Sequence, residues 1–313
     1  MTVTPLAAPI PPPPPPPVDR LDPGITVLRA NDPVTITAEV GQGVNPGDVT
    51  VTIARDDGTR LATDAPAGGS GATDRTYDLT SEDTAVLDLL TATWTGIIKG
   101  TAGTLTTRYA VVSDFLFSTA EAREFDGGKL GSVTAYPDAA IDDARTRIAT
   151  WFQQICGVSF VGRYRRVRVR GDGSDTVLLP DLLTTVLRSV ATRATGGNVY
   201  TPVDAAALPA MQLDPAGVLV WEGGSWPTGV GAVEVAYEYG HAEVPRAIRY
   251  AALKVLTNQI IPSNLSDRTI QQSTQWGIIQ LATPNPAVWG RWFGIPQADS
   301  ALASYFALAP KVG

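Results

Sequence analysis

Side chains suited to catalysis are scarce in this sequence, which has one histidine and one cysteine among 313 residues. His241 lies between a predicted strand and a predicted helix, where a turn residue with a local hydrogen bond is favoured over a catalytic base. Cys156 falls on the apolar side of a predicted helix end. A buried structural thiol is favoured there, because a reactive thiol needs an electropositive, partly exposed setting. One His and one Cys also exclude a zinc site of Cys and His ligands within one chain.

Motifs for other reaction types are missing as well. No serine stands in a Gly-x-Ser-x-Gly nucleophile motif, and the Gly-Gly-Ser-Gly stretch at 68–71 lacks the lysine of a phosphate-binding loop. The carboxylates are numerous, but their spacing singles out no pair. We therefore expect no catalytic residue, no cofactor and no metal, and we expect that the chain is not an enzyme.

A run of arginines is the main concentration of charge. In a β-strand Arg166, Arg168 and Arg170 share one face, because successive side chains alternate. Three interpretations of this face stay open: exposure to solvent, pairing with acidic residues of a neighbouring subunit or partner, and contact with DNA. Guanidinium groups bind carboxylates and phosphates with the same geometry, so sequence does not separate the last two. The run consists of Arg163, Arg165, Arg166, Arg168 and Arg170.

Aromatic side chains are concentrated in residues 263–313, a weakly periodic segment with many prolines and glycines. Such rings are common anchors of protein interfaces. One interpretation is an extended C-terminal arm that docks its rings on a partner, and the other is a segment that packs back on its own helices. The rings are Trp276, Trp289, Trp292, Phe293, Tyr305 and Phe306.

The formal net charge of −7 argues against broad nucleic-acid binding, which needs clustered Lys and Arg. It is compatible with a surface that DNA passes without sticking. No apolar run approaches the roughly 18 residues of a membrane span, so we expect no membrane contact. The sequence start lacks the pattern of a signal peptide, and a single cysteine allows no intramolecular disulfide. We therefore expect the protein to be made and assembled in the cytoplasm.

The order of the patterns predicts an α+β chain. Residues 1–24 include seven consecutive prolines, Pro11 to Pro17, which favour a stiff polyproline II segment. This N-terminal arm is either a linker or tail, or an arm that docks on a neighbouring subunit. Residues 25–117 show short alternating strands separated by turn residues, which predicts an all-β immunoglobulin-like sandwich.

Residues 118–262 are predicted to form a second domain, with long helices at roughly 137–156 and 245–261 bracketing a β-rich insert over 158–240. Each helix has an apolar stripe, and we expect the two stripes to pack together and carry the insert outward. Ser118 with Glu121 predicts a capping box, and Gly157 a helix end. The first stripe contains Ile141, Ala144, Ile148, Trp151, Phe152 and Ile155.

Five segments follow one another in a distinctive order. They are AIDDARTRIATWFQQICGVSF (140–160), VLLPDLLTTVLRSV (177–190), GVLVWEGGSWPTG (217–229), VEVAYEYGHAEVPRAIRYAALKVL (233–256) and GIPQADSALASYF (294–306). In this order they resemble the first long helix, leucine–proline stretch, Trp-Pro-x-Gly hairpin, final strand and helix, and C-terminal motif of the head–tail adaptor, or connector, family of long-tailed bacteriophages. The resemblance covers about residues 118–306, so the N-terminal immunoglobulin-like sandwich is an addition to it.

The resemblance implies a structural virion protein of the neck, at the head–tail junction. Subunits of this family form a ring, here expected to be a homo-oligomeric dodecamer, beneath the portal protein. The ring lines the DNA channel without sequence-specific binding and offers its far side to a stopper or tail-completion protein. By this resemblance the C-terminal rings dock on the portal. The alternatives are a host-adhesion or carbohydrate-binding decoration protein built on the sandwich, or another neck or tail-completion protein.

Overall fold

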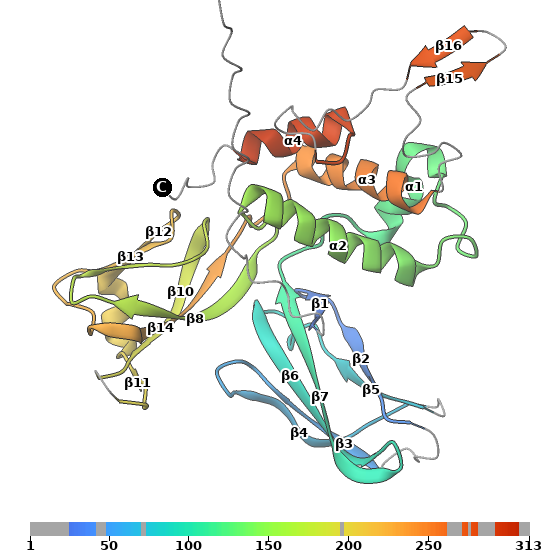
Figure 1. Ribbon diagram of the computed structural model, residues 1–313. Helices are drawn as coiled ribbons and strands as arrows, with labels where there is room; N and C mark the ends of the chain where they lie inside the picture. The colour runs from blue at the N-terminus through green and yellow to red at the C-terminus, as the bar shows by residue number, and fades with distance from the viewer. Residues whose placement is uncertain are drawn as a thin grey trace, which may run out of the picture.

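A computed structural model describes residues 25–41, 48–69, 73–194, 197–261, 271–274, 277–280 and 292–306 (Figure 1). The chain is a mixed α+β protein in which strands predominate. Its buried apolar side chains fall into three separate clusters. One cluster lies in the N-terminal sheets, one among the helices, and one in the sheets between the two long helices.

The N-terminal part consists of seven strands in two sheets, which share one core. Five strands pair in the order β1-β7-β6-β3-β4, with β1 parallel to β7, and β2 pairs with β5. Trp94 at the centre of β6 is fully buried, and its Nε1 donates to Thr107 Oγ1 at 3.1 Å. The strands are β1 Ile25–Arg29, β2 Val34–Glu39, β3 Val49–Ala54, β4 Arg60–Pro66, β5 Asp74–Leu79, β6 Asp88–Ile98 and β7 Thr101–Val112.

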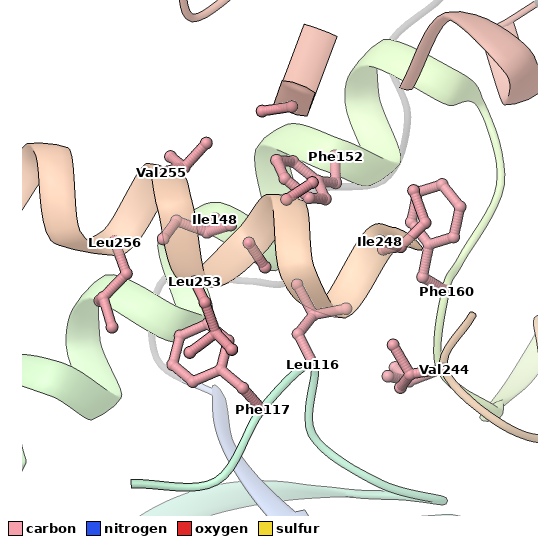
Figure 2. Close-up of a cluster of buried hydrophobic side chains, with 14 of the residues drawn as sticks. Leu116, Phe117, Ile148, Phe152, Phe160, Val244, Ile248, Leu253, Val255 and Leu256 are labelled. Atoms are coloured by element: carbon pink, nitrogen blue, oxygen red, sulfur yellow. The ribbon is translucent and has the colours of Figure 1, made fainter. Parts of the chain in front are cut away.

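The helices form a layer above this sandwich (Figure 1). The two expected long helices are α2 Asp138–Cys156 and α3 Arg246–Ile260, and their apolar faces share one core, as Figure 2 shows for Ile148, Phe152 and Ile248. A shorter helix, α1 Thr119–Gly128, precedes them. Among the described helices, none combines the length and hydropathy that crossing a bilayer requires.

Helix ends follow the signals in the sequence. Ser118 caps α1 in a reciprocal capping box with Glu121, as predicted. Gly157 ends α2 in the left-handed conformation, with its N–H bonded to Gln153 O at 2.8 Å. One residue of the predicted apolar stripe is misplaced, because Trp151 is 37% exposed beside the stripe. Cys156, one turn after Phe152, is buried on that face instead.

Between α2 and α3 lies the expected β-rich insert, which projects sideways from the helices (Figure 1). Its main sheet has the order β11-β10-β14-β8, and a smaller sheet has the order β12-β13-β9. Trp226 fills the shared core, 1% exposed, and its Nε1 donates to Asp175 O at 2.7 Å. The elements are β8 Arg163–Gly171, β9 Thr176–Leu178, β10 Thr184–Thr192, β11 Thr201–Pro202, a 3₁₀ helix Ala205–Ala210, β12 Met211–Asp214, β13 Val218–Trp221 and β14 Gly229–Tyr239.

The C-terminal part differs from the extended arm that was expected. After α3 come two short strands, β15 Gln271–Thr274 and β16 Gly277–Gln280, which pair with each other. Helix α4 then spans Pro296–Phe306 and packs on α2 and α3, with Ala298 and Leu302 fully buried. The extended-arm prediction is therefore wrong for residues 296–306, where two buried aliphatic side chains one helical turn apart hold a helix against the core.

We predict that Gly240→Ala is more destabilising than Gly223→Ala. Both glycines have positive φ, at 98° and 75°, so alanine costs about 1–2 kcal/mol at either position. At Gly240 the new Cβ would also lie 2.2 Å from Val161 O, whereas at Gly223 it meets nothing within 4 Å. The clash adds about 1–3 kcal/mol at Gly240, the usual range for overpacking. Urea unfolding of both variants measures the difference, and equal losses would contradict the close approach.

Candidate functional site

The arginine strand is β8, and its outer face meets carboxylates of the same chain. Arg166 Nε donates to Asp56 Oδ2 at 2.6 Å, and its Nη1 donates to Glu234 Oε1 at 3.2 Å. Arg168 Nε donates to the other oxygen of Glu234 at 2.8 Å. Arg170, at the far end of the strand, is exposed. Arg166 and Arg168 are thus balanced within the subunit, a possibility that was not among the three interpretations of the sequence.

Asp56 connects the sandwich to the insert. It lies in the turn between β3 and β4, and it accepts hydrogen bonds from Arg166 and from Tyr164 Oη, the latter at 2.9 Å. Burial raises the pKa of the Tyr164 phenol, and the Asp56 carboxylate adds to that shift, so the hydroxyl stays protonated and donates. A second connection lies nearby, where Ser113 Oγ accepts from Gly162 N at 2.8 Å.

The inner face of β8 holds the other two arginines. Arg165 Nη1 contacts both carboxylate oxygens of Asp181 at 3.0 Å, and Tyr237 Oη donates to Asp181 at 2.6 Å. Arg163 is 7% exposed, and burial lowers the pKa of its guanidinium. Its Nε has no hydrogen-bond partner among the described residues. These arginines belong to the packing of the insert.

His241 lies in the turn before α3, as expected, and packs between two rings. Its imidazole stacks on Phe160 at 5.7 Å between centroids, and Tyr305 of α4 meets it edge-on at 5.7 Å. Burial lowers its pKa, and its Nε2 is buried without a partner among the described residues. The backbone N–H of His241 donates to Ser159 O at 3.1 Å, and the side chain makes ring contacts.

Cys156 is fully buried at the end of α2, where its Sγ lies 3.6 Å from Leu302 O. Burial raises its pKa to about 12, so the thiolate is scarce at neutral pH. Within the described ranges, no group of three or more His, Cys, Asp or Glu side chains is placed to hold a metal ion.

Four of the six rings proposed for docking are in the described part, and three of them pack on the chain's own helices. Phe293 lies 5.6 Å from the Phe152 ring, and Tyr305 lies 5.0 Å from Phe160. Trp292 is half-buried and contacts Phe306, which is 39% exposed. For these residues the structure shows the second interpretation, a segment that packs back on its helices. Trp276 and Trp289 lie outside the described residues.

Asp299 positions this segment, although no pattern in the sequence singled it out. The residue is 4% exposed in the first turn of α4, and its Oδ1 accepts hydrogen bonds from the backbone N–H groups of Trp292 and Phe293 at 3.0 and 2.9 Å. A carboxylate in the first turn is a known signal of a helix start. Its hydrogen bonds to the residues before the helix also require the turn at Gly294, which the sequence pattern does not show. Asp299 thereby holds the backbone of Trp292 and Phe293, and the Phe293 ring contacts Phe152 of α2.

The rings form one side of an open groove of about 490 Å³ between α2 and α3, here called the α2–α3 groove. Trp151 and Phe293, 6.1 Å apart, lie at one end of it. No charged side chain lines it among the described residues. Its lining consists of Trp151, Gln154, Ile155, Val255, Asn258, Gln259, Trp292, Phe293 and Ile295.

No protein-family model matches the chain, and no curated protein matches it. Among solved structures, it is similar to a chain of "Neck of empty GTA particle computed with C6 symmetry", with a TM-score of 0.38 and 19% identity over 48% of this chain and 80% of that one. A chain of "Neck of native GTA particle computed with C12 symmetry" gives a TM-score of 0.35 and 15% identity, over 54% of this chain and 82% of that one. A chain of "Virion of native gene transfer agent (GTA) particle" gives a TM-score of 0.34 and 15% identity, over 50% of this chain and 80% of that one. At these scores the likeness is partial, and no functional conclusion follows from it.

Asp56→Ala should loosen the sandwich from the insert. The variant removes the acceptor shared by Tyr164 and Arg166, and a hydrogen bond to a charged group contributes about 1.5–3 kcal/mol when buried and less at this partly exposed site. We expect a loss of about 1–2 kcal/mol in urea unfolding and a larger radius of gyration in small-angle X-ray scattering. Asp57→Ala is the matched control, because it removes the neighbouring exposed charge and keeps the hydrogen bonds of Asp56 with Tyr164 and Arg166. Identical scattering of the two variants would show that Asp56 does not join the two parts.

Stability should fall as the pH is lowered from 7.5 to 5.5, because of His241. Burial lowers its folded-state pKa below the unfolded value of about 6.5, so the unfolded chain binds the proton more readily. The stability that comes from keeping His241 neutral is therefore complete above pH 6.5 and is lost as the pH falls below it. His241 is the only histidine, so His241→Asn should flatten the dependence of the free energy of unfolding on pH in this window. An unchanged slope in the variant would assign the dependence to carboxylates instead.

Proposed function

We propose that this protein is a head–tail adaptor of a tailed bacteriophage or phage-like particle. It forms a homo-oligomeric ring, a dodecamer, in the neck beneath the portal protein, and it presents its far side to a stopper or tail-completion protein. The family resemblance over residues 118–306 suggests this role. The structural observation that carries it is the hairpin β15–β16, which projects from the helical layer (Figure 1).

This hairpin needs a partner for physical reasons. Each strand has four residues, and no other described strand extends their sheet. An isolated two-stranded hairpin is marginally stable in water, and it becomes stable when further strands or a helix pack against it. A neighbouring subunit or the portal protein would supply that packing, so the hairpin is suited to an assembly contact.

The docking role of the C-terminal rings is narrower than first expected. Trp292, Phe293 and Tyr305 support the chain's own helices. This leaves the exposed Phe306, together with Trp276 and Trp289, as proposed portal anchors. Aromatic side chains are the usual anchors of such interfaces.

The charge distribution suits a channel that DNA passes without sequence-specific binding. Arg165, Arg166 and Arg168 are paired with carboxylates of their own chain, so they are less available to phosphates. Arg170 is exposed and can meet a partner or the DNA. With a net charge of −7, weak contact with the DNA backbone is the expected behaviour.

Replacement of residues 271–280 by a Gly-Ser linker of equal length should abolish attachment to DNA-filled heads. The thermal unfolding midpoint should stay unchanged, because the hairpin pairs with no other described strand. Co-sedimentation with portal-bearing heads measures attachment, and we expect at least a tenfold decrease. Ile278→Val, which keeps a strand-forming residue, is the control and should attach normally. Wild-type attachment by the linker variant would rule out the hairpin as the contact.

A further inference from the structure

The α2–α3 groove has the chemistry of a site for an uncharged, extended peptide. Its rings and aliphatic side chains provide apolar surface, and Trp151 at its edge is 37% exposed although it is a large aromatic residue. Its polar groups are amides and indoles. Among the described residues, the indole N–H groups of Trp151 and Trp292 donate no hydrogen bond, nor does the Gln154 amide. The groove thus offers free donors beside aromatic faces.

A polyproline II segment has the complementary chemistry. It lacks backbone N–H groups within a proline run, its carbonyls are exposed as acceptors, and its rings pack on aromatic side chains. This chain contains such a segment. Residues 5–18, PLAAPIPPPPPPPV, have no charged side chain, and the seven prolines from Pro11 to Pro17 would extend about 22 Å at 3.1 Å per residue. That length is enough to cross two adjacent helices of about 10 Å each.

We propose that the proline run Pro11–Pro17 of one copy docks in the α2–α3 groove of a neighbouring copy. Trp151, Trp292 and Phe293 pack on the proline rings, and Gln154 with the indole N–H groups donates to the carbonyls. This contact rests on the proposed ring, and it would join successive subunits head to tail around it.

Reach favours the neighbour's groove over the chain's own. Ile25 pairs with Arg108, four residues before β7 ends at Val112, so the arm leaves the sandwich about 13 Å before the end of β7 that leads to the helices, at 3.3 Å per residue. Figure 2 shows Leu116, from the chain following β7, on one side of α3, and Val255 of the groove on the other. An arm to the chain's own groove must therefore also pass a helix about 10 Å thick.

Eight Cα–Cα steps join Pro17 to Ile25, and they span at most about 29 Å when fully extended, so little length beyond that sum of about 23 Å remains for the path around the helix. An arm that reaches the groove of an adjacent subunit does not have to pass around its own α3. The other candidate occupant is the chain's own segment 281–291, which contains Trp289 and joins the groove at Trp292. If segment 281–291 filled the groove, the proline run would have no partner there. Cross-linking distinguishes these two occupants.

Disulfide cross-linking of the full chain tests the proposal. Gln154→Cys is combined with Pro11→Cys, Pro14→Cys or Pro17→Cys, since bridging needs Cα atoms within about 7 Å. The native Cys156 is buried with a pKa of about 12, so it does not compete under mild oxidation. We expect at least one pair to give a ladder of covalent oligomers in a denaturing gel, at least ten times as much as the control. The control replaces Gln154→Cys by Thr146→Cys, an exposed position about 12 Å earlier on α2.

The mass of the unoxidised assembly, measured by light scattering, separates the two levels of the proposal. Rings without a ladder would overturn the arm contact and leave the adaptor role standing. A covalently closed monomer, with faster gel mobility and no ladder, would show that the arm occupies its own groove and would overturn the contact between copies. A chain that is monomeric at all concentrations would overturn the proposed ring together with the contact.

Discussion

The arrangement of this molecule depends on one carboxylate, that of Asp56. The sandwich and the insert each have their own core, and both meet the helical core at its edge, through Val27 and Val112 of the sandwich and Leu182 and Leu183 of the insert. Asp56 adds a contact directly between the sandwich and the insert. Asp56 projects from a turn of the sandwich and accepts hydrogen bonds from Tyr164 and Arg166 of β8. Because Arg166 also pairs with Glu234 on the neighbouring strand, the turn is held against a sheet of the insert and not against one mobile side chain. The hydrogen bonds between Ser113 and Gly162 fix the same junction at the backbone.

A similar relay joins the helices to the sandwich. Asp114, just after β7, contacts Arg29 of β1 at 3.1 Å and Arg249 of α3 at 3.4 Å. Arg249 continues to Glu121, the capping-box residue of α1, at 2.7 Å. The desolvation of such half-buried pairs offsets much of their attraction, so their main effect is to select one orientation.

Local patterns in the sequence were sufficient for much of the fold. Both long helices follow from the 3.6-residue period, and the caps at Ser118 and Gly157 follow from side-chain and backbone chemistry at single positions. The pairing of the arginines could not be predicted in this way, because Arg166 meets Glu234 and Asp56 at separations of 68 and 110 residues. Helix α4 was missed for a related reason. It is short, and its two buried aliphatic side chains are buried only because they pack on α2 and α3. The sequence does not show that these helices lie beside it.

The position of α4 also sets the order in which the chain can mature during synthesis. Strands β1 to β7 make their core from the first 112 residues, so the sandwich can form while the rest is still being translated. The helical core is closed by Leu302, whose carbonyl meets Cys156 across 146 residues of sequence. The helical layer, and the surface built on it, therefore forms only after residues 296–306 have been translated. A nascent chain that stops before α4 has a complete sandwich core and an incomplete helical core.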